Sequence, residues 1–575
     1  MGNDILKHDD SIDQADDPFK MIERPGFIVT DEWIDGKPPG LYYCWTKPGS
    51  KYYPELDIDQ WVCAPLAVNA ITHDSEGNNF GRMLEFKPTI GNRKTWSMPM
   101  ELLKGDCSEL RGMLLDMGFE ITTDKKVRDR LPEYIQRQHP KETLKCVTQT
   151  GWVTPDCFVL PHKVYGAGSV TYQSGFKFTN EYRVRGTLRD WQINIAKLAI
   201  GNPMFMLALS TAFAAPLLNI INAEPGGVHF VGDSSTGKTT LLNAACSVWG
   251  GDSYKRSWRA TANGLEGVAA MFNDGFLALD EISECDPSEI GEIIYSLGNG
   301  QGKQRASRTG TARAVAKWRC MILSTGERTV ETSMKEGRRN IKAGQALRLV
   351  DVNVECEHGV FDNLHGFSSG SDLSNAIKKA AKEDYGVAGD VFLERLIQYR
   401  IDDDEFELPT IEAQDGQHRR VANRFVLIAL AGELATTFGI TGWLPGAATE
   451  AAKLAFQRWQ EAQPKDRNET SKILEAVANF IDKHGDARFG GGIDSDVYCE
   501  TTPITVRDRA GFKGKHGVYH FLSDGLHEAL RGFDFNRAKD VLIAKGILLN
   551  ATTEQRKING ENFRVYNIDS ARLYP

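Results

Sequence analysis

Short apolar runs separated by turn signals occupy the chain from residue 24 to about residue 185. Runs such as LYYCW, WVCAPLAVNAI, MLEFK and TWSMPM alternate with Asp-Gly, Pro-Gly and Gly-Asn pairs. Apolar runs of this length between turn residues are typical of strands. A helical pattern covers 108–118 and ends at Gly118. We therefore expect a mixed, strand-rich domain over residues 24–185.

Apolar strands alternate with helical patterns from residue 186 to residue 370. Strands are predicted at 227–232, 275–281, 318–327 and 345–354, and helices at 241–250 and 287–300. This alternation predicts a parallel sheet with crossover helices. The uncharged stretch 198–223 is long enough to span a bilayer. Pro203 and Pro216 interrupt it and no basic cluster flanks it, so we expect a buried helix.

Helical spacing of apolar residues dominates residues 371–462, where we expect a helical lid. A polar linker follows, and helices are predicted at 472–485, 522–532 and 536–546. ILLN and NFRVYNI are then expected to pair around a turn containing Asn559 and Gly560. This order predicts a winged-helix-like domain over 463–575. Residues 1–23 are polar and acidic and are expected to form a disordered tail.

Composition limits where the protein acts and what surfaces it offers. Net charge is 68 − 77 = −9, so any nucleic acid must bind at a local basic surface rather than over the whole chain. Ten cysteines without a CxxC pair indicate a reducing compartment. The polar start has no apolar segment typical of a secretory signal. We expect a cytoplasmic protein without a membrane role.

The octapeptide GDSSTGKT at 232–239 matches the phosphate-binding pattern GxxxxGK[ST] in full. Gly232 and Gly237 let the backbone curl so that its N–H groups face phosphate oxygens. Lys238 would bind the β- and γ-phosphates of ATP, and Thr239 would offer its hydroxyl to Mg²⁺. A helix N-terminus follows beneath the anion. The expected nucleotide-binding residues are Gly232, Asp233, Ser234, Ser235, Thr236, Gly237, Lys238, Thr239 and Thr240.

A pair of acidic residues ends the next apolar strand, FLALDE. Asp280 would hold Mg²⁺, together with Thr239, and Glu281 would orient and polarise the attacking water. The following strand ends in Ser324 and Thr325, either of which could sense the γ-phosphate. A polar cap at the end of the strand is the alternative for this pair.

Several arginines are candidates for contacts with ATP. Arg348 follows the third strand, where an arginine finger could reach the nucleotide of a neighbouring subunit, and Arg338 and Arg339 compete for that role. Arg420 and Arg424 lie one helical turn apart and could act as lid arginines facing the nucleotide. A solvated or salt-bridged surface position is the alternative for each of them.

The segment 301–319 concentrates basic residues and contains no acidic one. Gly302 and Gly310 would allow a hairpin that grips the phosphates of single-stranded DNA in the centre of a ring. The alternative is a loop that pairs with an acidic neighbouring subunit. The expected DNA contacts are Lys303, Arg305, Arg308, Arg313 and Lys317.

The motifs HFVGDSSTGKTT, SWRATANGLE, FLALDE, GNGQGKQRA, LSTGE and AGQALRLVD, in this order, resemble the bacterial P-loop family called domain of unknown function 927. Members are encoded largely by prophages, plasmids and other mobile elements. Their ATPase core is similar to self-loading ring helicases of the additional-strand (AAA+) class, which work on DNA as hexamers. The resemblance implies an α/β P-loop core of that class and the roles given above for Lys238, Thr239, Asp280, Glu281 and Arg348. This chain has Ser324-Thr325 where Asn is commoner.

We therefore expect an ATP- and Mg²⁺-dependent, hexameric helicase or translocase of a mobile element in the bacterial cytoplasm. It would act on single-stranded or forked DNA, with a primase or another replication protein as a candidate partner. Two alternatives remain open. One is an ATP-switched replication initiator or regulator that binds DNA without unwinding it, and the other is a remodelling or phage-defence ATPase that does not act on DNA.

Overall fold

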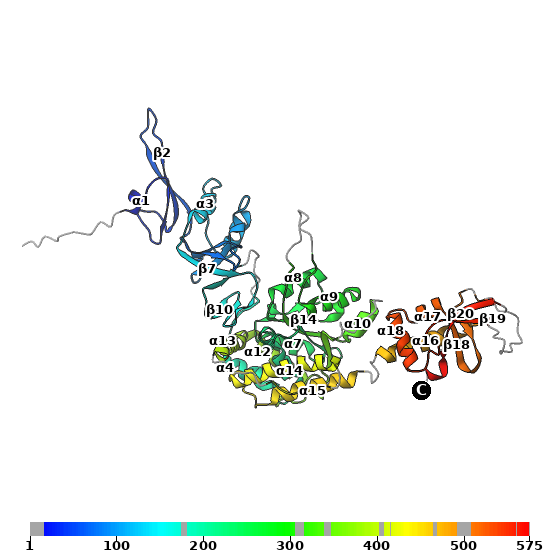
Figure 1. Ribbon diagram of the computed structural model, residues 1–575. Coiled ribbons are helices and arrows are strands. Elements are labelled where there is room, and N and C mark those ends of the chain that lie inside the picture. The colour runs from blue at the N-terminus through cyan, green and yellow to red at the C-terminus, as the bar shows by residue number, and fades with distance from the viewer. Residues whose placement is uncertain are drawn as a thin grey trace, which may run out of the picture. The chain divides into compact units, whose positions relative to one another are not determined.

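The computed structural model describes residues 17–173, 181–304, 315–337, 347–401, 408–413, 416–463, 469–490, 506, 508–558 and 561–573. The chain divides into two compact units, Met1–Gln457 and Arg458–Pro575 (Figure 1). No helix in the described ranges combines the length and the apolar composition that crossing a bilayer requires.

The first unit begins with a short helix on a three-stranded antiparallel sheet, in the order β1-β2-β3. The elements are α1 (Pro18–Met21), β1 (Gly26–Thr30), β2 (Gly40–Lys47) and β3 (Leu56–Cys63). Helix α1 lies inside the stretch expected to be a disordered tail. It is held because Phe19 is buried against Tyr42, with ring centroids 5.0 Å apart.

A five-stranded mixed sheet, in the order β11-β7-β4-β5-β6, and a three-stranded sheet, β10-β9-β8, follow. The elements are β4 (Leu66–His73), β5 (Gly81–Phe86), β6 (Lys94–Pro99), η1 (Met100–Leu103), α2 (Ser108–Asp116), α3 (Arg130–Arg137), β7 (Glu142–Val147), β8 (Gly151–Thr154), β9 (Cys157–Leu160), β10 (Lys163–Gly166) and β11 (Val170–Tyr172). The predicted helix at 108–118 is confirmed by α2. The apolar run 61–71 forms two strands, because Pro65 lies between them and cannot donate a ladder hydrogen bond.

A five-stranded parallel sheet, in the order β13-β14-β15-β12-β16, forms the centre of the first unit. Its strands are β12 (Gly226–Val231), β13 (Arg256–Ser257), β14 (Gly275–Asp280), β15 (Cys320–Gly326) and β16 (Leu349–Asn353). The predicted parallel sheet is confirmed, with strands close to the four that the sequence indicates. Strand β15 lies between β12 and β14, although it follows both of them in the chain.

Helices surround this sheet (Figure 1). They are α4 (Leu188–Asn194), η2 (Ala196–Ala199), α5 (Pro203–Phe213), α6 (Leu217–Ile220), α7 (Lys238–Cys246), η3 (Asp252–Tyr254), α8 (Ala262–Met271), η4 (Ile282–Glu284), α9 (Pro287–Asn299), α10 (Val330–Glu336), α12 (Gly370–Glu383), α13 (Val387–Ile401), α14 (Gly416–Thr437) and α15 (Ala447–Ala462). Helices α5 and α7 pack together against β14 and β15, while α9 contacts β12 and packs with α8 and α10. The uncharged stretch 198–223 forms α5 and α6, and α5 is buried from Met204 to Phe213, as predicted.

The second unit combines helices with a four-stranded antiparallel sheet, in the order β17-β18-β20-β19. Its elements are α16 (Glu469–Arg488), β17 (Gly511–Lys513), η5 (Lys515–Gly517), β18 (Val518–Leu522), α17 (Ser523–Ala529), α18 (Phe535–Ala544), β19 (Glu554–Ile558), β20 (Glu561–Asp569) and η6 (Ser570–Arg572). ILLN pairs with the end of NFRVYNI, as predicted, through Leu548 and Ile568, but it is not the strand that leads into the turn of the hairpin. The polar strand EQRKI takes that place and pairs with the first half of β20, while Ile547 and Leu548 are buried in the core of the unit.

Candidate nucleotide site

The segment Gly232–Gly237 joins the end of β12 to the start of α7 at the carboxyl edge of the parallel sheet. Gly237 has a φ of +109°, and a Cβ atom there would lie 2.8 Å from Cγ2 of Val360. Only glycine meets both demands without strain. The loop therefore delivers the chain directly to a helix N-terminus, where backbone N–H groups favour an anion.

The side chain of Lys238 is buried in this loop. Its ammonium group donates hydrogen bonds to the carbonyl oxygens of Gly232, at 2.8 Å, and Asp233, at 2.6 Å. Both acceptors belong to the loop itself, so the charge is held at the centre of the curled backbone. Phosphate oxygens bound in the loop would lie next to this charge.

The carboxylate of Asp280 lies at the end of β14, next to two hydroxyl groups. Thr239 Oγ1 donates to Asp280 Oδ1 at 3.1 Å, and Thr325 Oγ1 donates to the same oxygen at 2.7 Å. These residues come from α7, β14 and β15, and they meet because parallel strands end at the same edge of a sheet. The hydroxyl of Thr239 and the carboxylate of Asp280 are oxygen donors of the kind that Mg²⁺ prefers, so the residues present fit that ion.

Glu281 directly follows Asp280 and has a φ of +56°. Its backbone N–H donates to Thr325 Oγ1 at 3.2 Å, and its carboxylate accepts a hydrogen bond of 2.7 Å from the hydroxyl of Ser283. The left-handed backbone turns the chain out of the strand at this point, and the Glu281 side chain lines the cavity described next.

A cavity of about 620 Å³ extends from the loop and brings together residues from distant parts of the chain. Ser234–Thr240 and Glu281, which the sequence predicts, line it. The sequence analysis missed its other lining residues, which are Glu327, His358, Gly359, Gly370, Ser371, Ser374, Asn375 and Lys378. Four of the missed residues lie in the first turns of α12, and the polar run SGSDLSN was their one local signal. Lys378 adds a cation to the cavity beyond the loop.

Glu355, in the segment that follows β16, supports the phosphate loop. Glu355 accepts a hydrogen bond of 2.8 Å from the backbone N–H of Asp233. A Cβ atom on Gly359 would lie 2.4 Å from the carbonyl oxygen of Thr236, so this segment also approaches the loop closely. Residues 355–360 therefore support the loop from outside, which no motif in the sequence indicates.

Ser324 and Thr325, the two candidates for a phosphate sensor, have different surroundings. The Ser324 hydroxyl lies 2.8 Å from Nδ1 of His229 and accepts a hydrogen bond of 2.9 Å from Trp258 Nε1. His229 is fully buried and its Nε2 lies 3.0 Å from the carbonyl oxygen of Arg328. Burial lowers the pKa of His229 to about 4. Of the two hydroxyls, Thr325 is the one that contacts Asp280.

Arg348 and Arg424 lie at the opposite edge of the sheet, where β12 and β16 begin. Arg424 is buried and donates a hydrogen bond of 2.6 Å to the carbonyl oxygen of Leu347, and burial lowers its pKa to about 10. Arg348 donates to the side chain of Asn299, and its guanidinium lies 4.7 Å from the ring centre of Tyr295. Neither side chain lines the cavity around Lys238 in its own subunit.

The other arginine candidates divide between the described and the undescribed parts of the chain. Arg420 is exposed on α14, one turn before Arg424. Arg338 and Arg339 lie outside the described residues. The arrangement therefore keeps Arg348 and Arg420 as the described candidates for contact with a neighbouring molecule.

The two ends of the basic segment 301–319 lie side by side in antiparallel orientation. Gln301 pairs with Lys317, and the backbone N–H of Gly302 donates to the carbonyl oxygen of Ala316 at 2.9 Å. They leave α9 and enter β15 at the edge of the sheet opposite the phosphate loop. Lys303 forms an ion pair with Glu292. Arg305, Arg308 and Arg313 lie outside the described residues.

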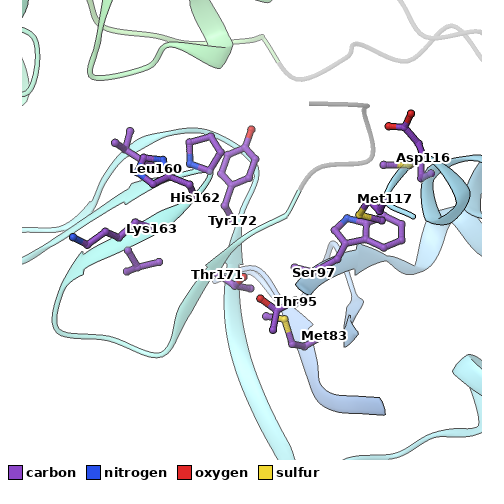
Figure 2. Close-up of a pocket in the computed structure, with 14 residues that line it drawn as sticks. Met83, Thr95, Ser97, Asp116, Met117, Leu160, His162, Lys163, Thr171 and Tyr172 are labelled. Carbon is purple, nitrogen blue, oxygen red and sulfur yellow. The ribbon is translucent and has the colours of Figure 1, made fainter. Parts of the chain in front are cut away.

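A second cavity, of about 360 Å³, lies in the N-terminal part of the first unit (Figure 2). Leu160, His162, Lys163 and Tyr172 lie on one side of it, and Met83, Met117 and Asp116 on the other (Figure 2). Lys163 is held by the carboxylate of Glu394 at 2.7 Å. None of the residues that the sequence singles out lines this cavity.

The fold of this chain is similar to that of a solved structure. The structure titled "SCCmec type IV Cch - active helicase" has a TM-score of 0.65 and 19% sequence identity, and the alignment covers 96% of this chain and 99% of that chain. The apo C-terminal region of NrS-1 gives a TM-score of 0.30 at 11% identity, covering 87% and 95%. NtrX from Brucella abortus with ATP gives 0.21 at 16% identity, covering 49% and 62%. At the last two scores neither resemblance informs the fold.

No curated protein sequence matches this chain. The model of the family described as Domain of unknown function (DUF927) matches residues 36–317, a span that includes the phosphate loop and the Asp280-Glu281 pair. Over this span the chain is similar to the DUF927 family.

Proposed function

We propose that this protein hydrolyses ATP with Mg²⁺ and uses the energy to move on single-stranded DNA, as a helicase or translocase of a mobile genetic element. One observation carries the proposal. Lys238, Thr239, Asp280 and Thr325, from three segments of the chain, converge at one edge of a parallel sheet, with Glu281 lining the same cavity. A binding loop, a cation site and an acidic residue next to water-accessible space are the parts that phosphoryl transfer needs.

Each side chain has a distinct task in this proposal. Lys238 moves its hydrogen bonds from the loop carbonyls to the β- and γ-phosphates. Thr239 and Asp280 would hold Mg²⁺, which offsets negative charge on the phosphates when bound. Glu281 accepts a hydrogen bond from the attacking water and polarises it. Thr325 orients Asp280 through the 2.7 Å hydrogen bond and lies where a γ-phosphate can be sensed.

The strand order supports a P-loop core of the additional-strand, AAA+ type. Strand β15, which carries Thr325, lies between the loop strand β12 and the acidic strand β14. Proteins of that class bind ATP between the subunits of a ring, commonly a hexamer. Arg348, at the edge of the sheet away from its own cavity, then serves as the finger that reaches a neighbour's nucleotide.

The basic segment supports DNA as the substrate of the movement. Its paired ends rise from the sheet edge opposite the phosphate loop, so a shift of β15 or α9 during hydrolysis is passed to the segment. The phosphates of single-stranded DNA would be held by Arg305, Arg308, Arg313 and Lys317. Lys303 would either leave Glu292 and join them or stay paired with Glu292. The helices and hairpin of the second unit support a winged-helix-like module that positions DNA.

ATP hydrolysis measured with and without single-stranded DNA tests the proposal. We expect hydrolysis that DNA stimulates, that Lys238→Ala abolishes, and that loses its DNA stimulation in an Arg305/Arg308/Arg313 triple alanine variant. A second triple alanine variant provides the charge-matched control, and it changes exposed residues away from the basic segment. These residues are Arg189, Lys197 and Arg395.

The same assay separates the alternatives. Hydrolysis that is indifferent to DNA and to the Arg305 triple change would exclude a DNA motor and favour a remodelling or defence ATPase. DNA binding that requires ATP, without strand displacement on a forked substrate, would favour an ATP-switched initiator or regulator.

A further inference from the structure

Asp280 forms an ion pair with a lysine that lies outside the phosphate-binding motif. The ammonium group of Lys255 lies 2.7 Å from Asp280 Oδ2, while the hydroxyls of Thr239 and Thr325 bind Oδ1. The two carboxylate oxygens are thus divided between an ammonium and two hydroxyls. The side chains of Lys255 and Asp280 are 28% and 18% exposed, so solvent screens this pair only in part.

The backbone around Lys255 is fixed from both sides. Tyr254 is fully buried and its hydroxyl donates to the carbonyl oxygen of Phe276 at 2.8 Å. Arg256 forms an ion pair with the buried Glu181, and the fully buried Trp258 donates to Ser324. Strand β13, which begins at Arg256, also pairs with β14 next to Asp280. Lys255 is therefore held within reach of Asp280 by the fold rather than by a chance surface rotamer.

We propose that Lys255 is a resident counter-cation at Asp280 that lowers the affinity of the empty site for divalent ions. The inference rests on the proposed function, because it concerns the same cation site. A divalent ion held by Thr239 and Asp280 must either share the carboxylate with the ammonium or displace it. Both cases weaken binding of the ion, since like charges repel at this separation.

The consequence is an order of binding. While the ammonium group of Lys255 is paired with Asp280, it neutralises the charge of that carboxylate, so the empty site binds free Mg²⁺ poorly. The phosphates of ATP add negative charge to the cavity and outweigh the ammonium, so the ion enters with its nucleotide. Lys255 acts through its ion pair with Asp280, so it is a positioning residue for that carboxylate.

Binding of a fluorescent ADP analogue, titrated with Mg²⁺, tests this inference without relying on hydrolysis. We expect Lys255→Met to lower the Mg²⁺ concentration at half-maximal binding by roughly tenfold. Lys255→Arg keeps the charge and should stay within about twofold of wild type. Binding of Mn²⁺ without nucleotide, followed by electron paramagnetic resonance, should strengthen in Lys255→Met in the same sense.

The Asp280→Asn background provides the decisive control. If Lys255 acts through the carboxylate, Lys255→Met should not change the Mg²⁺ dependence when Asp280 is already Asn. With Asp280 intact, an unchanged Mg²⁺ concentration at half-maximal binding in Lys255→Met would overturn the inference. A higher Mg²⁺ concentration at half-maximal binding, in a variant that melts at the wild-type temperature, would also overturn it. Absence of nucleotide binding by the wild-type protein would instead overturn the proposed function, and the inference with it.

Discussion

The hydroxyl of Ser324 lies 2.8 Å from Nδ1 of His229, inside the parallel sheet rather than at the phosphate loop. Trp258 Nε1–H donates to the same hydroxyl, which leaves the hydroxyl proton free to be donated to His229. His229 Nε2–H then donates to the carbonyl oxygen of Arg328, in the segment that follows β15. This buried chain of hydrogen bonds links Trp258, which directly follows β13, to β12, β15 and that segment, and Thr325 remains facing Asp280.

The neighbouring hydroxyls Ser324 and Thr325 should therefore respond differently to removal. Ser324→Ala leaves two buried partners unsatisfied and should cost about 1–3 kcal/mol of unfolding free energy, with ATP turnover per folded molecule near wild type. Thr325→Ala removes the hydroxyl that binds Asp280 and should reduce turnover per folded molecule about tenfold or more, in addition to a stability cost of similar size. Urea unfolding and single-turnover hydrolysis measure the two effects. Equal loss of turnover in both variants would contradict this assignment.

His229 should contribute a loss of folding stability in acid. Its pKa is lowered to about 4 in the folded protein, against 6.5 in the unfolded chain. Between pH 6.5 and pH 4 the unfolded chain takes up a proton that the folded protein does not, so stability is lost as pH falls. The full loss, below pH 4, is about 3 kcal/mol.

Urea unfolding of wild type and His229→Gln across this pH range measures the loss. Asp351, opposite His229 on β16, acts in the other direction, because its pKa is raised to about 7 and its protonation stabilises the fold as pH falls. Asp351→Asn should therefore make stability fall more, or rise less, as pH is lowered, and His229→Gln should have the opposite effect. The same pH slope in His229→Gln and wild type would rule out His229 as the cause.

Arg424 should be needed for stability rather than for contact with ATP in its own subunit. Its buried guanidinium donates to the carbonyl oxygen of Leu347, so Arg424→Met should cost about 1–3 kcal/mol of unfolding free energy. Arg420→Met is the matched control, because Arg420 is exposed one turn earlier and should change stability by less than about 0.5 kcal/mol. If Arg424→Met keeps wild-type stability and loses only ATP affinity, Arg424 acts as a lid arginine after all.

Nucleotide binding and hydrolysis should separate at Glu281. Glu281→Gln keeps Lys238, Thr239 and Asp280, so ATP with Mg²⁺ should still raise the melting temperature, by an amount equivalent to about 2.7 kcal/mol at a hundred times Kd. Turnover should fall about a hundredfold or more, because the amide cannot polarise water. Thermal melting and phosphate release measure the two properties.

Lys238→Ala serves as the control for this separation, since it removes the phosphate contact itself. It should lose both the rise in melting temperature and the turnover. A Glu281→Gln protein that hydrolyses ATP at the wild-type rate would exclude Glu281 as the residue that activates water.

Local patterns in the sequence predicted much of the fold and the central residues of the site. The alternation of apolar strands and helices predicted the parallel sheet, because strand and helix periods are written into neighbouring residues. The loop at 232–239 and the pair Asp280-Glu281 were identifiable because phosphate binding and cation binding need set residue types at set spacings. The hairpin strand EQRKI escaped notice because its side chains are polar and its pairing depends on β20.

Long-range contacts decided the rest, and no local pattern encodes them. The insertion of β15 between β12 and β14, the choice of Thr325 over Ser324 beside Asp280, and the placing of Lys255 on the same carboxylate join residues far apart in the chain. Strand alternation sends adjacent side chains to opposite faces, but only the packed sheet determines which face meets Asp280. The sequence by itself determined the chemical groups of the candidate site, and the tertiary structure decided their partners.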